Sequence, residues 1–136
     1  RTPNQEVTEG SQGDTSMAVI LVIDDQEPIR AFLRAALEGD GHEVLEAANG
    51  RLGLELYRER SADLIITDIV MPEMDGLELM VELRRSFPNV KVIAMSGGLE
   101  GYEGLNVAKQ LGARQTFHKP FVMGELLIAV RYDLVH

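Results

Sequence analysis

Cysteine and tryptophan are both absent from the 136 residues of the sequence. Without cysteine, neither a disulfide framework nor a thiolate metal site can form, and the chain is compatible with a reducing cytoplasm. The longest apolar run, 17–23, is far shorter than the roughly 20 residues of a membrane-spanning helix, and no basic signal-peptide segment precedes it. We therefore expect a cytoplasmic protein that does not insert into membranes.

Basic residues are outnumbered in this sequence. It has 13 Lys and Arg against 22 Asp and Glu, which gives a formal net charge of −9. Attraction to nucleic acid or to anionic lipid depends on clustered cationic side chains. The charge balance therefore opposes direct nucleic-acid binding by this domain.

The distribution of apolar residues indicates one folded domain. Residues 1–16 have Val7 as their one large aliphatic side chain and are rich in Gly, Ser, Thr, Gln and acids, so they bury too little apolar area to offset the cost of ordering. Residues 17–136 are numerous and apolar enough for a single core. We expect a flexible tail or linker over 1–16 and one domain over 17–136.

Short apolar runs alternate with helical stretches along that domain. Five runs of strand length, mostly rich in β-branched residues, lie at 18–23, 43–47, 64–67, 90–95 and, more weakly, 115–118. Apolar residues at helical spacing lie between or after them, clearly over 29–37 and 123–134 and more weakly over 51–60, 77–86 and 105–111. Such alternation predicts an α/β fold in which a five-stranded parallel sheet is covered by helices on both faces.

Polar residues directly follow four of the predicted strands. They are Asp24 and Asp25 after the first strand, Asp68 after the third, Ser96 after the fourth and Lys119 after the fifth. The carboxyl ends of parallel strands meet at one edge of an open sheet, where ligands bind. Three carboxylates at one place must take up protons or hold a cation, and oxygen ligands without nearby Cys or His favour Mg²⁺. A carboxylate beside Mg²⁺ and an ammonium group, with a hydroxyl opposite, suits phosphoryl transfer onto the carboxylate.

Each of these residues has a simpler interpretation when taken singly. An Asp pair after a strand is most often a turn or a helix N-cap, and a lone Asp, Ser or Lys at a strand end is most often only solvated. The functional interpretation depends on four separate strand ends that carry complementary groups, which chance rarely produces. Taken together, the groups predict an aspartyl phosphate on Asp68.

A family resemblance extends over nearly all of the predicted domain. Response-regulator receiver domains of two-component systems, including chemotaxis regulators, have four signature blocks that this chain resembles in order and spacing: ILVIDDQEPIR, DLIITDIVMPEMDG, VIAMSG and FHKPF. The resemblance implies a flavodoxin-like (βα)₅ fold, a doubly wound sandwich around the parallel sheet. It also implies that a histidine kinase or phosphotransfer protein donates the phosphoryl group in a phosphorelay, and that an unidentified effector or output domain responds.

The resemblance further implies which residues hold the metal. Asp68 corresponds to the phospho-acceptor of the family. Asp25 and Asp68 correspond to direct Mg²⁺ ligands, together with the backbone carbonyl of Val70, while Asp24 acts largely through a water. These assignments predict which side chains the phosphoryl chemistry needs.

The resemblance also implies a switch region. Ser96 corresponds to the switch hydroxyl and Lys119 to the phosphate-contacting lysine, and Lys119–Pro120 corresponds to a cis peptide bond. The position three before the lysine is often Tyr or Phe in the family but is Thr116 here. Phe117 is one residue out of register, whereas His118 shares a strand face with Thr116 and is a candidate substitute for the missing ring.

Other patterns in the chain point to no second function. His42, His118 and His136 lack metal-ligand spacing, which favours core or surface positions. The glycines of 97–104 do not form a dinucleotide fingerprint, so we expect a mobile loop after the fourth strand. Ser96 lacks the G-x-S-x-G setting of a serine hydrolase.

Two other function classes share features with this chain. A small-molecule aspartyl-phosphate phosphotransferase or phosphatase would use the same acidic site, but it needs a substrate cap and no insertion is long enough to form one. A flavin-binding protein is disfavoured because Trp and a Ser/Thr-rich phosphate loop after the first strand are both absent. We expect an interaction protein that catalyses only its own phosphorylation and dephosphorylation, either alone or as part of a larger regulator or hybrid kinase.

Overall fold

The apolar runs of the sequence form one parallel sheet in the computed structural model of the chain, which describes residues 18–136. The strands are β1 Val19–Ile23, β2 Glu43–Ala47, β3 Leu64–Asp68, β4 Val92–Gly97 and β5 Gln115–Lys119. The helices that alternate with them are α1 Glu27–Gly39, α2 Gly50–Glu59, α3 Gly76–Ser86, α4 Gly98–Gln110 and α5 Met123–Val135. The strand order is β2-β1-β3-β4-β5, with all neighbours parallel. The predicted fold is confirmed, whereas the predicted tail over 1–16 lies outside the described residues.

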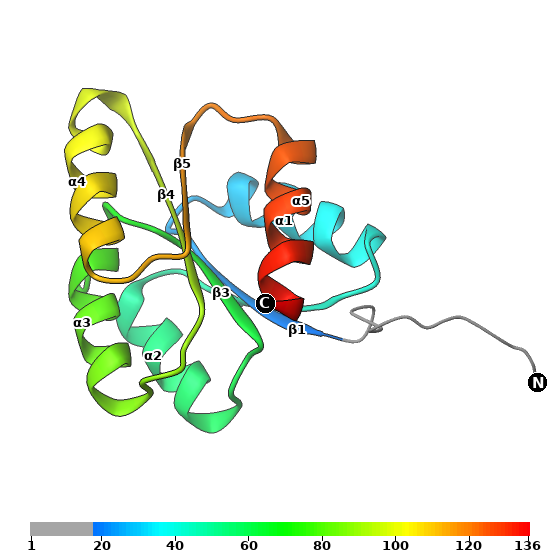
Figure 1. Ribbon diagram of the computed structural model, residues 1–136, viewed down its shortest axis with the longest axis horizontal. Coiled ribbons are helices and arrows are strands. Elements are labelled where there is room, and N and C mark those ends of the chain that lie inside the picture. The colour runs from blue at the N-terminus through cyan, green and yellow to red at the C-terminus, as the bar shows by residue number, and fades with distance from the viewer. Residues whose placement is uncertain (1–17) are drawn as a thin grey trace, which may run out of the picture.

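Helices cover both faces of the sheet (Figure 1). On one face α2, α3 and α4 pack over a core that includes Leu21 and Ile23 of β1, and on the other face α1 and α5 pack over Ile20 and Val22. One strand supplies both cores because successive side chains point to opposite faces. Since neither face of β1 meets water, the strand is a continuous apolar run.

Local sequence determines where the helices beside the site begin. In α1, Pro28 lies in the first turn, where its missing N–H is not needed, and Leu33 and Leu37 follow on the buried face. At the start of α3, the Asp75 carboxylate accepts a hydrogen bond from the Glu78 N–H, and the Glu78 carboxylate accepts one from the Asp75 N–H. These starts anchor the segments that leave β1 and β3.

The segment after β4 differs from the prediction. Instead of a mobile loop over 97–104, β4 ends at Gly97 and α4 begins at the next residue. Gly101 packs closely against the end of β4, because a Cβ on it would make a tight contact of 3.2 Å with the Oγ of Ser96. The loop prediction was wrong because the first buried side chain of α4 larger than glycine is Leu105, so the preceding turns show no apolar period.

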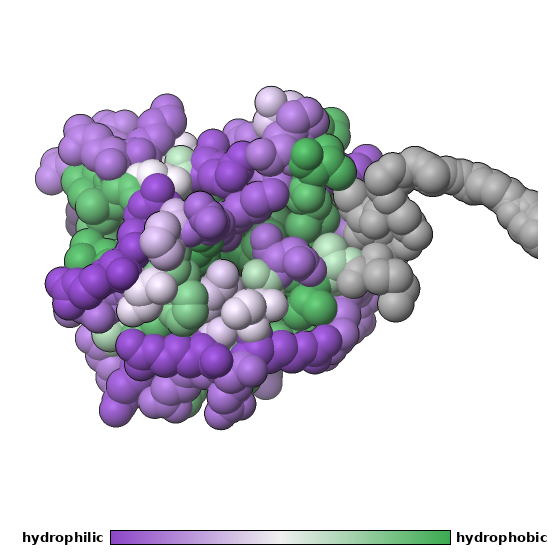
Figure 2. Space-filling view, turned by 60° about the horizontal axis from the view of Figure 1, so that its bottom comes forward, coloured by the Kyte–Doolittle hydropathy of each residue, from purple (hydrophilic) through white to green (hydrophobic). Residues whose placement is uncertain are grey.

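One face of the described residues is largely hydrophilic (Figure 2). Figure 2 brings forward the lower end of the molecule in Figure 1, where hydrophilic residues cover most of the face and hydrophobic ones show in separate patches. Within 18–136, no helix combines the length and the apolar content that crossing a bilayer requires.

Candidate functional site

Three carboxylates meet at the carboxyl edge of the sheet. Asp24 and Asp25 follow β1, and Asp68 is the last residue of β3. Because β1 and β3 are neighbours, with Ile23 paired to Thr67, the acids come together, and one carboxylate oxygen from each lies within 4.8 Å of the others. Asp24 and Asp68 are buried, whereas Asp25 is exposed. The predicted acidic cluster is confirmed.

Lys119 reaches this cluster from the end of β5, an edge strand of the sheet. Its Nζ lies 3.0 Å from Oδ2 of Asp24 and 3.1 Å from Oδ2 of Asp68. The side chain extends past the end of β4, where Gly97 is its partner in the β4–β5 register, and a Cβ on Gly97 would lie 3.4 Å from the Lys119 Cβ. The Lys119 side chain thus crosses the end of β4 to reach acids that follow β1 and end β3.

Burial and neighbouring charges shift the pKa values of Asp68 and Lys119. Burial and the neighbouring charge of Asp24 raise the pKa of Asp68, although Lys119 and the Ile69 N–H counteract them. Burial disfavours the ammonium of Lys119, but the hydrogen bonds and charges of Asp24 and Asp68 outweigh it and raise the pKa of Lys119. One ammonium among three carboxylates leaves a surplus of negative charge, and this surplus fits a divalent cation.

The three acids differ in their hydrogen bonds and in their exposure to a cation. Asp24 accepts from Lys119 through Oδ2 and from the Gln26 N–H through Oδ1 at 2.9 Å. Asp68 accepts from the Ile69 N–H through Oδ1 at 2.8 Å. Each oxygen of Asp24 and of Asp68 therefore accepts one hydrogen bond, since Lys119 also contacts Oδ2 of Asp68, whereas Asp25 is exposed and so accessible to a direct ligand bond.

The remaining predicted residues lie around this cluster. Ser96 is buried on β4, one residue beyond the Met95 that pairs with Asp68. The Lys119–Pro120 peptide bond is cis, as expected. Val70 follows Asp68 by two residues and has 66% of its surface exposed.

The strand faces of β5 follow the predicted alternation. Phe117 packs with Phe121 in the core beneath α1 and α5, with ring centroids 5.6 Å apart. His118 lies on the opposite face and contacts Tyr102 of α4. Thr116 shares that face, and it supplies no ring.

Two residues that support the site were not predicted from the sequence. Arg30 donates from Nη1 to the carbonyl oxygen of Asp24 at 2.7 Å and from Nε to Glu46 at 3.0 Å, so it braces the turn that carries the acidic pair. Gly76 packs on the acceptor strand, since a Cβ there would lie 2.3 Å from the carbonyl oxygen of Asp68. The spacing of Arg30 does not distinguish it from a surface arginine, but Gly76 follows a helix cap, where a glycine is a signal of close approach.

The fold agrees with comparisons to known proteins. The response regulator receiver domain model matches residues 20–131. The chain therefore belongs to the response regulator receiver domain family, as the sequence blocks predicted. It is a receiver domain of two-component signalling.

Individual relatives support the assignment. The KDP operon transcriptional regulatory protein KdpE of Escherichia coli K12 is 40% identical over 118 residues, which cover 87% of this chain and 52% of KdpE. Sporulation initiation phosphotransferase F of Bacillus subtilis is 34% identical over 112 residues, which cover 82% of this chain and 90% of that protein. A solved receiver domain protein from Clostridium thermocellum has a TM-score of 0.81 at 33% identity and covers 87% of this chain and 94% of that chain. The chain thus spans about half of KdpE and most of the other two.

Proposed function

We propose that this receiver domain accepts a phosphoryl group on Asp68, in the presence of Mg²⁺, from a histidine kinase or a phosphotransfer protein. The observation that carries the proposal is the convergence on Asp68 of an ammonium group and two further carboxylates from three strand ends. A phosphoryl acceptor needs positive charge around the equatorial oxygens of the group in transfer. Lys119 supplies part of that charge, and the acids are suited to hold the cation that supplies the rest.

The residues that would hold Mg²⁺ are Asp25, Asp68 and the backbone carbonyl of Val70, with Asp24 acting through a water. Oxygen donors of this kind are the ligands that Mg²⁺ prefers, and Mg²⁺ usually keeps several waters. An indirect role for Asp24 is supported by its complete burial, whereas Asp68 keeps 7% of its surface exposed and Asp25 is exposed. When bound, Mg²⁺ supplies positive charge beside the phosphoryl oxygens.

The protein residues divide the chemistry among them. A carboxylate oxygen of Asp68 attacks phosphorus, the bond from phosphorus to the donor histidine nitrogen breaks, and the electron pair of that bond returns to the imidazole. Lys119 contacts a phosphoryl oxygen with its ammonium group. Ser96 is buried at the neighbouring strand end, and its hydroxyl donates a hydrogen bond to a second phosphoryl oxygen. Because α4 begins two residues later, this bond links phosphorylation to α4.

The switch region that we propose comprises Ser96, Thr116 and Pro120. Its movement changes the face that the domain presents to an effector or output domain. Because Thr116 has no ring, the coupling between Ser96 and that face depends on other side chains of β5 and α4.

The rate of phosphate release distinguishes this function from that of a small-molecule phosphotransferase or phosphatase. With acetyl phosphate and Mg²⁺, we expect the intact mass of the chain to increase by one phosphoryl group and chelation to prevent the increase. Phosphate release should then be limited by the lifetime of the phosphorylated protein, because the domain acts only on itself. Rapid hydrolysis of small phosphate esters that does not pass through the phosphorylated chain would favour the enzyme class.

The lifetime of the phosphorylated state depends on Val70 and Gly98, which we place on either side of the attacking water. Neither Val70 nor Gly98 has a side-chain group that can hydrogen-bond that water. The water is therefore not oriented for attack, and hydrolysis loses the rate advantage that orientation gives. Val70→Asn is expected to speed autodephosphorylation by about fivefold, the effect of one added hydrogen bond in the transition state. The measurement is the decay of phosphorylated protein in excess Mg²⁺ after the donor is removed. Unchanged or slower decay would show that access of water limits hydrolysis.

A further inference from the structure

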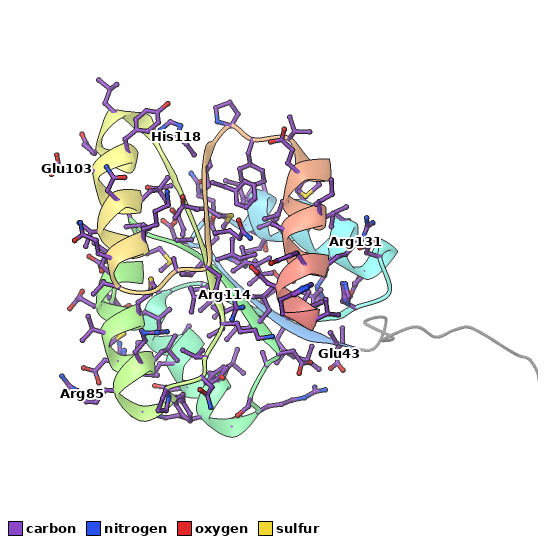
Figure 3. The ribbon with its side chains drawn as sticks, viewed as in Figure 1. Glu43, Arg85, Glu103, Arg114, His118 and Arg131 are labelled. Atoms are coloured by element: carbon purple, nitrogen blue, oxygen red, sulfur yellow. The ribbon has the colours of Figure 1, made fainter. Side chains whose placement is uncertain are left out.

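An imidazole on β5 bridges the sheet to α4. Nε2 of His118 lies 2.6 Å from the carbonyl oxygen of Gly98, and a protonated Nε2 donates a hydrogen bond to it. The same ring stacks on Tyr102, with centroids 3.8 Å apart and an interplanar angle of 7°. Figure 3 shows His118 between β5 and the first turns of α4. Two separate contacts of one side chain therefore hold the start of α4 against β5.

This bridge lies directly beside the switch hydroxyl. Ser96 pairs with His118 in the β4–β5 register, and Gly98 follows Ser96 by two residues with a φ of 73°. Gly101 packs against Ser96, because a Cβ on Gly101 would lie 3.2 Å from the Ser96 Oγ. A shift of Ser96 toward a phosphoryl group on Asp68 therefore moves the segment that His118 holds.

We propose that His118 and Tyr102 form a latch that holds the start of α4 in its unphosphorylated position, and that phosphorylation releases the His118–Gly98 hydrogen bond. The inference rests on the proposed function, since Asp68 is the residue that triggers the release. The latch differs from an aromatic switch residue at position 116, because it acts on the backbone of α4 from the position next to Lys119.

The strength of the latch suits a switch. A partly solvent-exposed hydrogen bond and one ring stack contribute little net free energy, so a phosphoryl group can overcome them. Anything that stabilises the unphosphorylated position lowers the population that is ready for the phosphoryl group, and its removal raises the apparent affinity of a phosphoryl mimic. This relation gives the latch a measurable consequence.

The experiment uses the full chain with Mg²⁺ and beryllofluoride, a phosphoryl mimic, observed by NMR. In the wild type, we expect saturation to shift the imidazole nitrogen signals of His118 and the amide signals of 97–105. His118→Phe keeps a ring against Tyr102 but removes the donor. Its amide signals without the mimic should lie closer to the saturated positions, and its apparent affinity for beryllofluoride should rise by about fivefold.

The chain contains a matched control at the end of α5. His136 stacks on Tyr132 with centroids 4.0 Å apart, and its Nδ1 lies 2.9 Å from the carbonyl oxygen of Tyr132. His136→Phe changes the same kind of pair far along the chain from Ser96, and it should leave the affinity unchanged. His118→Gln retains a side-chain donor, and we expect it to recover part of the wild-type behaviour.

The outcomes separate the two proposals. Beryllofluoride that binds at Asp68 without shifting the His118 ring signals, or an unchanged affinity in His118→Phe, would overturn the latch and leave the proposed function intact. No binding of beryllofluoride by the folded wild type would overturn the proposed function and the latch with it. The wild-type ring signals report on the latch even where a variant does not fold.

Discussion

Asp25→Ala is expected to abolish phosphorylation by acetyl phosphate at moderate Mg²⁺ concentrations. Asp25 is the exposed member of the acidic cluster, whereas Asp24 is completely buried. The Asp25→Ala variant lacks a direct Mg²⁺ ligand that the buried Asp24 cannot replace. Since loss of a supporting group around a metal costs 10- to 100-fold in affinity, we expect the dissociation constant for Mg²⁺ to rise by at least about 100-fold.

The measurement is a titration with Mg²⁺ followed by NMR, together with labelling at each concentration. Glu27→Ala is the matched control, because Glu27 is another exposed acid, in the first turn of α1. It should bind Mg²⁺ almost as tightly as the wild type. Wild-type Mg²⁺ affinity in Asp25→Ala would show that Asp25 is not a ligand.

Gly76→Ala is expected to destabilise the fold and to disturb the acceptor. A Cβ at this position would lie 2.3 Å from the carbonyl oxygen of Asp68 and 2.9 Å from Cα of Ile69. These are backbone atoms, so no side chain can rotate away, and α3 must shift from β3. We expect a loss of about 3 kcal/mol in the free energy of unfolding, at the upper end for overpacking.

Denaturant unfolding measures this loss, and Gly124→Ala provides the comparison. No atom lies within 4 Å of a Cβ built on Gly124 in α5. Alanine there should stabilise the chain by about 0.5–1 kcal/mol, because glycine is costly in a helix. If the two variants unfold at the same denaturant concentration, the close packing of α3 on Asp68 is not as described.

The sheet and the acidic edge could be predicted because their causes are local in the sequence. β1 is buried on both faces and is therefore a plain apolar run. The end of that run places Asp24, just as the end of β3 places Asp68. Parallel strands then bring both residues to one edge, where Lys119 contacts them as expected.

Other features depend on packing that no local pattern encodes. The predicted fourth strand, 90–95, is displaced from the observed Val92–Gly97, and α4 begins within the segment predicted as a loop. The glycines of that segment resemble a loop sequence, but Gly101 lies in a helix turn that packs closely on Ser96. The bond from His118 to Gly98 likewise requires the strand register and the helix start together. Sequence spacing could place His118 on the correct face but not identify its partner.

The most direct measurement locates the phosphoryl group. The chain is incubated with acetyl phosphate and Mg²⁺, the aspartyl phosphate is reduced with borohydride, and the modified residue is identified by tandem mass spectrometry. We expect modification of Asp68 alone in the wild type, none in Asp68→Asn, and full labelling in Asp75→Asn, where asparagine still caps α3. Labelling of Asp68→Asn at the wild-type level, or modification of a different residue in the wild type, would contradict the assignment of Asp68 as the acceptor.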